Sequence, residues 1–159
     1  MINEESIKEY FGRELRVRMA YNDLHSCDMS YYCQISASNM TKYRRGERLP
    51  NVWELVLLAE RLECTVNELL GYDIVETIGK RKISDVCPGK NHYAIILKDQ
   101  IIHYMIQANM TVEMLAERTG ISISTIERWL DRWPHLPRTD HLLRLADALD
   151  CTPSDLLGY

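Results

Sequence analysis

The strongest constraint on this chain is an internal repeat. Residues 64–72 read CTVNELLGY, and residues 151–159 read CTPSDLLGY. When the alignment is extended backwards at the same offset of 87 residues, residues 49–72 and 136–159 are identical at 12 of 24 positions. Similarity of this kind indicates that one structural unit is encoded twice. The 159 residues are therefore expected to form two small domains.

The repeat continues upstream at an offset of 86, so the second copy carries one extra residue in a loop near Trp133. The aligned positions are apolar in both copies, which predicts that they belong to the two cores. The pairs are Met19 with Met105, Ile35 with Ile121, Met40 with Ile126, and Tyr43 with Trp129. The predicted organisation is a first copy at residues 1–72, a linker at 73–94 and a second copy at 95–159.

The sequence pattern predicts five helices in each copy, because apolar residues recur at helical spacing between N-capping signals. The predicted caps of the first copy are Ser6 with Glu9, Ser36, Asn51 with Glu54, and Thr65 with Glu68. In the second copy, Pro153 stands at a first helical position, where its missing N–H costs nothing. Strand-like alternation is absent outside the linker, so the fold is expected to be all-α. For the linker, a short strand pair and a loop both stay open.

Composition limits the function classes. The chain has 19 Lys and Arg against 23 Asp and Glu, a net charge of -4. An acidic balance argues against indiscriminate binding of polyanions, so any nucleic-acid role must depend on a local patch. No apolar run approaches the roughly 20 residues of a membrane-spanning helix. The acidic N-terminus does not resemble a secretory signal. We expect a cytoplasmic, nucleoid-associated protein.

Neither a metal site, a cofactor nor an enzyme is predicted. The five cysteines are scattered without a Cys-x-x-Cys pair, and the five histidines lack metal-ligand spacing. There is no glycine-rich phosphate loop and no nucleophile elbow. Cys64 and Cys151 occupy equivalent positions beside a predicted N-cap, where a helix N-terminus would lower a thiol pKa. We expect them instead to be small apolar filling of the core.

The most specific motif lies in the second copy. Residues 110–129 read MTVEMLAERTGISISTIERW. Ala116 is small where two helices cross closely, and Gly120 permits the positive φ of a tight turn. With this motif, each copy resembles the Cro/lambda-repressor type of helix-turn-helix domain, the XRE family, over residues 7–72 and 95–159. The resemblance implies two tandem five-helix lambda-repressor-like DNA-binding domains joined by a linker.

The first copy departs from the family pattern at two positions. Ser30 stands for the alanine and Gln34 for the turn glycine. A left-handed Gln34 is expected to cost on the order of 1 kcal/mol, which a folded domain tolerates. Downstream, residues 43–50 read YRRGERLP and are similar to the family's aromatic, basic, glycine, basic and proline stretch.

The resemblance implies that the second helix of each motif lies in the major groove of double-stranded DNA. By position in the family motif, the base-contacting residues are Ala37, Ser38, Asn39 and Lys42 in the first copy, and Ser124, Thr125 and Arg128 in the second. The phosphate-contacting residues are Ser26, Arg45, Arg48, Arg132 and Arg138. Asn39 can pair bidentately with adenine, and Lys42 can donate to guanine. Ile123 can contact only a thymine methyl, so the second copy reads DNA less well.

The local charge also indicates that the first copy contacts DNA more than the second. Residues 42–48 hold four cations against Glu47, a net of +3, whereas residues 128–135 hold Arg128 and Arg132 against Asp131, a net of +1. Our hypothesis is a transcriptional regulator, a repressor, in which the first copy makes most DNA contacts. The second copy would contribute further DNA contacts, mediate homodimerisation or bind a protein partner.

The competing hypothesis is a helix-turn-helix fold that has become a protein-interaction module, antitoxin-like or anti-repressor-like, and does not read DNA. The net charge of -4 and the weak reading surface of the second copy favour it. The basic stretch KYRRGER at residues 42–48 favours DNA.

Overall fold

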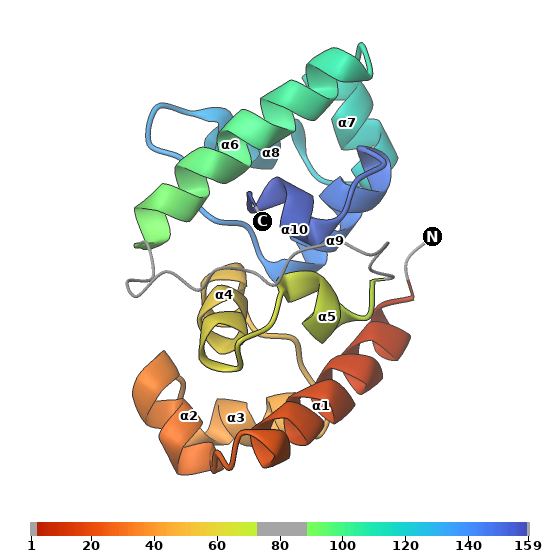
Figure 1. Ribbon diagram of the computed structural model, residues 1–159. Helices are drawn as coiled ribbons and strands as arrows, with labels where there is room; N and C mark the ends of the chain where they lie inside the picture. Colours follow the sequence, from red (N-terminus) through yellow and green to blue (C-terminus); the bar gives the residue numbers. More distant parts are fainter. Residues whose placement is uncertain (1–2, 73–88, 159) are drawn as a thin grey trace. The chain divides into compact units, whose positions relative to one another are not determined.

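The computed structural model of the protein describes residues 3–72 and 89–158, and every regular element in these two ranges is a helix (Figure 1). The expected all-α class is confirmed for this part of the chain. The contacts between residues divide it into two compact units. We call residues 3–72 the N-unit and residues 89–158 the C-unit.

The two units contain helices of matching order and length. The N-unit holds α1 (Glu4–Tyr21), α2 (Ser26–Cys33), α3 (Ala37–Arg44), α4 (Val52–Arg61) and α5 (Val66–Leu70). The C-unit holds α6 (Lys90–Gln107), α7 (Val112–Thr119), α8 (Ile123–Leu130), α9 (Thr139–Ala148) and α10 (Pro153–Leu156). The lengths run 18, 8, 8, 10 and 5 residues in the N-unit and 18, 8, 8, 10 and 4 in the C-unit.

Left-handed residues recur at the spacing of the sequence repeat. The pairs are Asp23 with Asn109, Gln34 with Gly120, Glu63 with Asp150, and Gly71 with Gly158, with φ between 50° and 80°. Each follows a helix and stops it, because a left-handed residue cannot continue a right-handed helix. The predicted left-handed Gln34 is confirmed, with φ 54° and ψ 38°.

Most predicted helix caps are confirmed, and one is wrong. Ser36 caps α3, while Asn51 with Glu54 and Thr65 with Glu68 form capping boxes on α4 and α5. The first helix does not begin at a Ser6–Glu9 box. It begins at Glu4, and the Asn3 side chain accepts from Ser6 N at 3.4 Å. Asparagine is a strong N-cap, and the acidic first turn suits the helix dipole, so the helix starts earlier.

The second helical unit also starts earlier than predicted. Helix α6 begins at Lys90, so the expected linker, residues 73–94, extends too far at its C-terminal end. The reason is that the buried stripe of α6 already includes Tyr93 and Ala94, one turn before Leu97. The choice between a strand pair and a loop for the linker concerns residues 73–88, which lie outside the described residues.

The predicted apolar pairs form the cores of the two units. All eight side chains named for the repeat are at most 8% exposed. In the N-unit, α1 packs on α3 and α5, and α2 packs on α3 and α4. In the C-unit, α7 packs on α8 and α9, and α10 packs on α6 and α9. These contacts hold the second and third helices of each unit in a fixed relation.

One backbone contact distinguishes the two units. A Cβ added to Gly12 of α1 would lie 2.7 Å from the backbone nitrogen of Gly46, so the helix touches the turn after α3 directly. The equivalent of Gly12 in the C-unit is Lys98, whose Nζ donates to the Asp131 carbonyl at 3.0 Å. In the second copy, a lysine side chain therefore makes the contact with the loop that backbone atoms make in the first copy.

Candidate nucleic-acid interface

The N-unit contains a helix-turn-helix element formed by α2, Gln34 to Ser36, and α3. Gln34 ends α2 in the left-handed conformation. The side chain of Ile35, 3% exposed, anchors the turn in the core. Ser36 then starts α3 by accepting a hydrogen bond from Asn39 N at 3.1 Å. Cap and anchor together fix the direction in which α3 leaves the turn.

The C-unit repeats this element with α7, the turn and α8. Gly120 takes the left-handed conformation, and Ile121, 5% exposed, is the buried anchor. Ser122 caps α8 by accepting from Thr125 N at 3.3 Å. The buried anchors Ile121 and Ile126, expected from the sequence, are confirmed.

The structure places the four predicted base-contacting residues of the N-unit on α3. Ala37, Ser38 and Lys42 are exposed, and Asn39 is half-buried. The opposite side of the helix, with Met40 and Tyr43, is buried. Within the described residues, no hydrogen bond or ion pair engages the Asn39 amide group or the Lys42 ammonium group. These two groups are free to bind an external partner.

The corresponding positions on α8 are less available. Ser124 and Arg128 are exposed, and Thr125 is half-buried. The hydroxyl oxygens of Ser124 and Thr125 lie 3.3 and 2.7 Å from Ser122 Oγ, so they share hydrogen bonds within the first turn. Ile123 adds an apolar side chain that is 40% exposed. This surface has fewer free hydrogen-bonding groups than that of α3.

Four of the five predicted phosphate-contacting residues are exposed arginines: Arg45, Arg48, Arg132 and Arg138. Two of them already face a carboxylate. Arg45 lies 3.9 Å from Glu47, and Arg138 Nε lies 3.1 Å from Asp140 Oδ1. Exposed ion pairs contribute about 0–1 kcal/mol, so both arginines can exchange these partners for a phosphate at little cost.

Ser26, the fifth, has a different environment. It is the first residue of α2 and is half-buried. Its hydroxyl oxygen accepts a hydrogen bond from Arg44 Nη1 at 2.7 Å. The hydroxyl hydrogen stays available for donation, because a serine hydroxyl donates one bond and accepts others.

Arg44 does not belong to the exposed basic surface, which corrects the charge estimate from the sequence. It is half-buried, directed at Ser26, and its carbonyl accepts a hydrogen bond from Arg16. The exposed charged side chains of residues 42–48 are Lys42, Arg45, Arg48 and Glu47, which sum to +2 rather than +3. The burial of Arg44 could have been predicted from its position in the helix, because Arg44 lies one turn after Met40, which is buried.

A partly buried polar contact, which no sequence motif indicates, fastens α3 to α4. The Tyr43 hydroxyl donates to Glu54 Oε2 at 2.5 Å, and Glu54 also completes the capping box of α4. Burial and the neighbouring Glu54 carboxylate raise the pKa of Tyr43 well above its usual value. The tyrosine therefore stays a neutral donor and holds the end of the candidate reading helix.

The thiols of Cys64 and Cys151 are not activated. Burial raises the pKa of Cys64 and of Cys151 to about 12, which outweighs their position beside a helix N-terminus. Cys64 is buried, as expected for core filling, whereas Cys151 is half-buried. Across residues 3–72 and 89–158, no group of three His, Cys, Asp or Glu side chains is placed to hold a metal ion.

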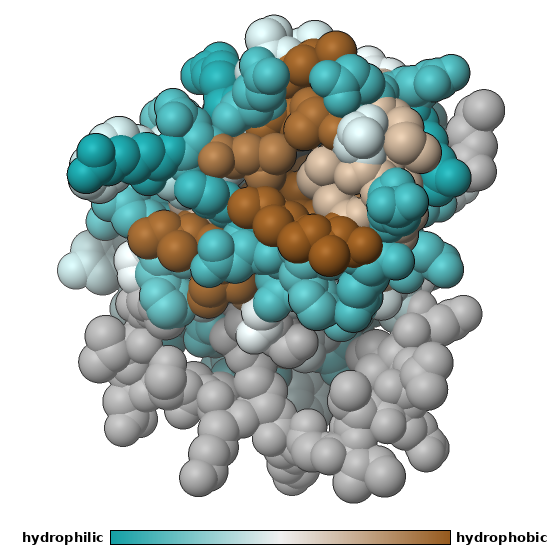
Figure 2. Space-filling view, turned by 90° about the horizontal axis from the view of Figure 1, so that it is seen from above, coloured by the Kyte–Doolittle hydropathy of each residue, from teal (hydrophilic) through white to brown (hydrophobic). Residues whose placement is uncertain are grey.

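The C-unit also exposes apolar side chains. Ile95, Ile102 and Ile106 of α6 are 53%, 37% and 73% exposed. Figure 2 shows apolar side chains gathered on the upper face of the C-unit and bordered by hydrophilic ones.

None of the helices in the described part of the chain has the length and apolar character needed to cross a membrane.

Comparison with known proteins finds one similarity, which lies in the C-unit. Residues 100–159 match the family model of the Cro/C1-type helix-turn-helix DNA-binding domain. No curated protein and no solved structure matches the chain. The match spans α7 to α10 and the second half of α6, so it includes the helix-turn-helix element described above. The C-terminal part of the chain is therefore similar to domains of this type.

Proposed function

We propose that this protein is a sequence-specific transcriptional repressor that binds double-stranded DNA through the N-unit and the C-unit. The single observation that carries the proposal is the exposed face of α3. There, the unengaged amide of Asn39 and ammonium of Lys42 stand next to two exposed arginines, Arg45 and Arg48.

The proposal treats the N-unit as a second domain of the Cro/C1 type. Three observations support this. The helix lengths of the two units correspond, the left-handed residues recur at the repeat spacing, and both turns are anchored by a buried isoleucine, Ile35 or Ile121. The family match itself lies within the C-unit.

In this account α3 lies in the major groove. Asn39 donates to and accepts from an adenine edge, and Lys42 donates to guanine O6 or N7. Arg45 and Arg48, at the end of the helix and in the turn after it, contact phosphates and fix the register. The C-unit contributes fewer base contacts, because the hydroxyls of its reading helix bind Ser122.

A second candidate function for the C-unit is protein binding, including homodimerisation. Ile123 at the start of α8 and Met114 of α7 are 40% and 43% exposed. On the same two helices, the exposed acidic residues Glu113, Glu117 and Glu127 outnumber the exposed basic residues Arg118 and Arg128. An apolar surface with acidic neighbours suits a protein partner better than a phosphate backbone.

The test is selection of bound sequences from random duplexes by the full chain, followed by footprinting. We expect a consensus sequence and a footprint of one half-site, or of two half-sites about one helical turn apart when both units bind. Binding that lacks a consensus and disappears at moderate salt would favour the protein-interaction function instead.

Asn39→Ala sharpens this test. The variant should lose the preference for adenine at one position of the consensus, at a cost of about 1–3 kcal/mol in affinity. Asn22→Ala is the matched control: Asn22 is another half-buried asparagine, whose amide binds the Arg18 carbonyl at the end of α1. The control should select the same sequence as the unaltered protein.

A further inference from the structure

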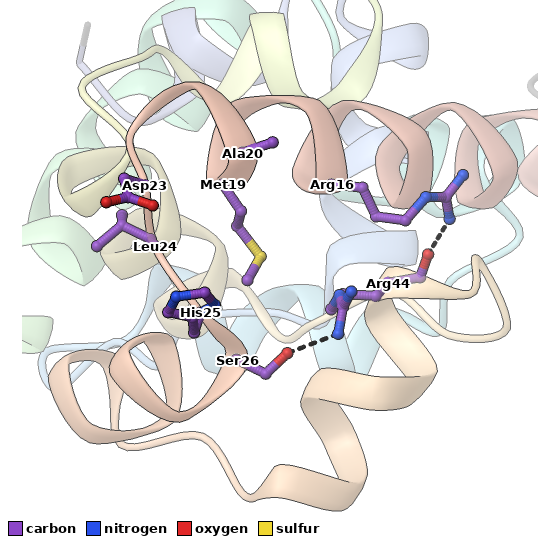
Figure 3. Close-up of a pocket in the computed structure, with 8 residues that line it drawn as sticks. All are labelled: Arg16, Met19, Ala20, Asp23, Leu24, His25, Ser26 and Arg44. Atoms are coloured by element: carbon purple, nitrogen blue, oxygen red, sulfur yellow. Dashed lines mark hydrogen bonds between the residues drawn. The ribbon is translucent and has the colours of Figure 1, made fainter.

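A cavity of about 360 Å³ opens in the N-unit beside the reading element. It lies between the last turns of α1, the first residues of α2 and the end of α3 (Figure 3). Arg16 and Arg44 line one side of it, Ser26 and His25 the base, and Asp23 the far side. A volume of this size falls within the range of small-molecule sites.

The Arg44 guanidinium extends into this space from α3, as Figure 3 shows. Its Nη1 donates to Ser26 Oγ at 2.7 Å. Its Nε is buried and has no acceptor among the described residues. A buried donor of a charged group without an acceptor is costly, and few such groups persist in folded proteins unless they serve a purpose.

An oxyanion is the acceptor that this group fits. The guanidinium carries a fork of N–H donors that matches two oxygens of a carboxylate or a phosphate. With Nη1 held by Ser26 and Nε buried, Nη2 is the guanidinium nitrogen that is left for a ligand in the cavity. The Ser26 hydroxyl hydrogen can donate to the same anion, because its oxygen already accepts from Arg44.

The charges around the cavity also favour an anion. Its titratable lining groups are Arg16, Arg44, His25 and Asp23, which sum to +1 with a neutral histidine. The single carboxylate, Asp23, lies across the cavity from Arg44 in Figure 3. The N-terminus of α2 adds little to this charge, because the Asp28 carboxylate already accepts a hydrogen bond from His25 N there.

The remaining wall is apolar. Met19, Ala20 and Leu24 complete the lining of the cavity. A ligand that fills the space would therefore combine an acidic group with a small carbon skeleton, rather than being a bare ion.

We propose that this cavity binds a small organic anion, a carboxylate or a phosphate ester, through Arg44 and Ser26. Residues of α1, α2 and α3 line the cavity. A bound anion would therefore contact the helices that hold the reading helix, α3, in its orientation. A role as an effector of DNA binding rests on the proposed function, but the binding of the anion does not.

The experiment follows the side-chain Nε–H signals of arginine by NMR in the full chain without DNA. Inorganic phosphate and then citrate are titrated at constant ionic strength. We expect a saturable shift of the Arg44 signal with citrate and a weaker one with phosphate. Citrate binding to the variants is measured from backbone amide shifts around the cavity. Arg44→Lys should weaken it at least tenfold, and Ser26→Ala should weaken it several-fold. Arg13→Lys, an exposed arginine of α1 outside the cavity, should leave it unchanged.

Shifts that do not saturate, or that spread equally over all arginines, would mean an adventitious ion only and would overturn the proposal. So would citrate binding that Arg44→Lys and Ser26→Ala leave intact. If neither anion binds and Arg44→Lys lowers DNA affinity instead, Arg44 contacts the DNA backbone and the cavity is no effector site. Failure of DNA selection would leave the anion result standing, so the two proposals fail separately.

Discussion

Gln34 and Gly120 occupy the same place in the two units and share one backbone conformation. Their φ and ψ angles are 54° and 38° for Gln34, and 69° and 16° for Gly120. Glycine adopts this left-handed conformation without strain, whereas a residue with a Cβ pays roughly 1–2 kcal/mol. The first copy therefore retains the turn at a cost that the second copy avoids.

Gln34→Gly should raise the free energy of unfolding of the N-unit by about 1 kcal/mol, because it removes this strain at an exposed position. Gly120→Ala should lower that of the C-unit by a similar amount, although nothing lies within 4 Å of its new Cβ. Urea denaturation followed by amide NMR signals of each unit measures both. A less stable Gln34→Gly variant would contradict the assignment.

Ser30→Ala should also stabilise the N-unit. The Ser30 hydroxyl oxygen is buried without a hydrogen-bond partner among the described residues, and the C-unit has Ala116 at this position. Removing an unsatisfied buried hydroxyl relieves a desolvation penalty of about 1–3 kcal/mol. The reverse change, Ala116→Ser, is the control and should lower the thermal midpoint of the C-unit. Loss of stability in Ser30→Ala would show that the hydroxyl has a hidden partner.

Gly12→Ala should destabilise the N-unit despite the higher helix propensity of alanine. Its Cβ would lie 2.7 Å from Gly46 N and 3.0 Å from the Tyr43 carbonyl oxygen, both of them backbone atoms that cannot move aside. Overpacking of this kind costs typically about 1–3 kcal/mol. Arg13→Ala, at the exposed neighbouring position of the same helix, serves as the control in the same thermal unfolding measurement. Equal midpoints for the two variants would argue against direct contact between α1 and the turn.

Alkaline pH should destabilise the protein through its buried thiols. The folded pKa is raised from 9.0 to about 11 for Cys33 and to about 12 for Cys64. Below pH 9 both states bind the thiol proton, so the stabilisation is fully present. Above pH 9 only the unfolded state loses the proton, so stability falls as the pH rises through the folded pKa.

The free energy of unfolding, measured by urea denaturation between pH 8 and pH 11, should therefore decrease, and Cys64→Ala should make that decrease shallower. An exposed cysteine, Cys27→Ala, is the control and should leave the slope unchanged. A slope insensitive to Cys64→Ala would show that other groups carry the pH dependence.

Much of this fold follows from local sequence signals. Helical periodicity and capping chemistry act between residues a few positions apart in the sequence. They therefore predict the buried positions of each unit, the three capping sites and the left-handed Gln34. The predicted start of α6 is too late because its N-cap residue, Gly89, has no side chain to give a capping signal in the sequence.

The candidate site was harder to predict. Local charge assigned Arg44 to an exposed basic surface, but its orientation depends on Ser26, 18 positions earlier, and on the space left by α1. The hydrogen bond between Tyr43 and Glu54 likewise depends on how α3 packs against α4. Such contacts between helices leave no periodic trace in a single sequence.

The most direct measurement of the central claim compares two double variants by fluorescence anisotropy on the selected duplex at several salt concentrations. Lys42→Gln with Arg45→Gln removes two exposed cations of the N-unit, and Arg128→Gln with Arg132→Gln removes two from the C-unit. We expect a much larger loss of affinity, and a larger decrease in the salt dependence, for the first pair. Equal losses for the two pairs would contradict it.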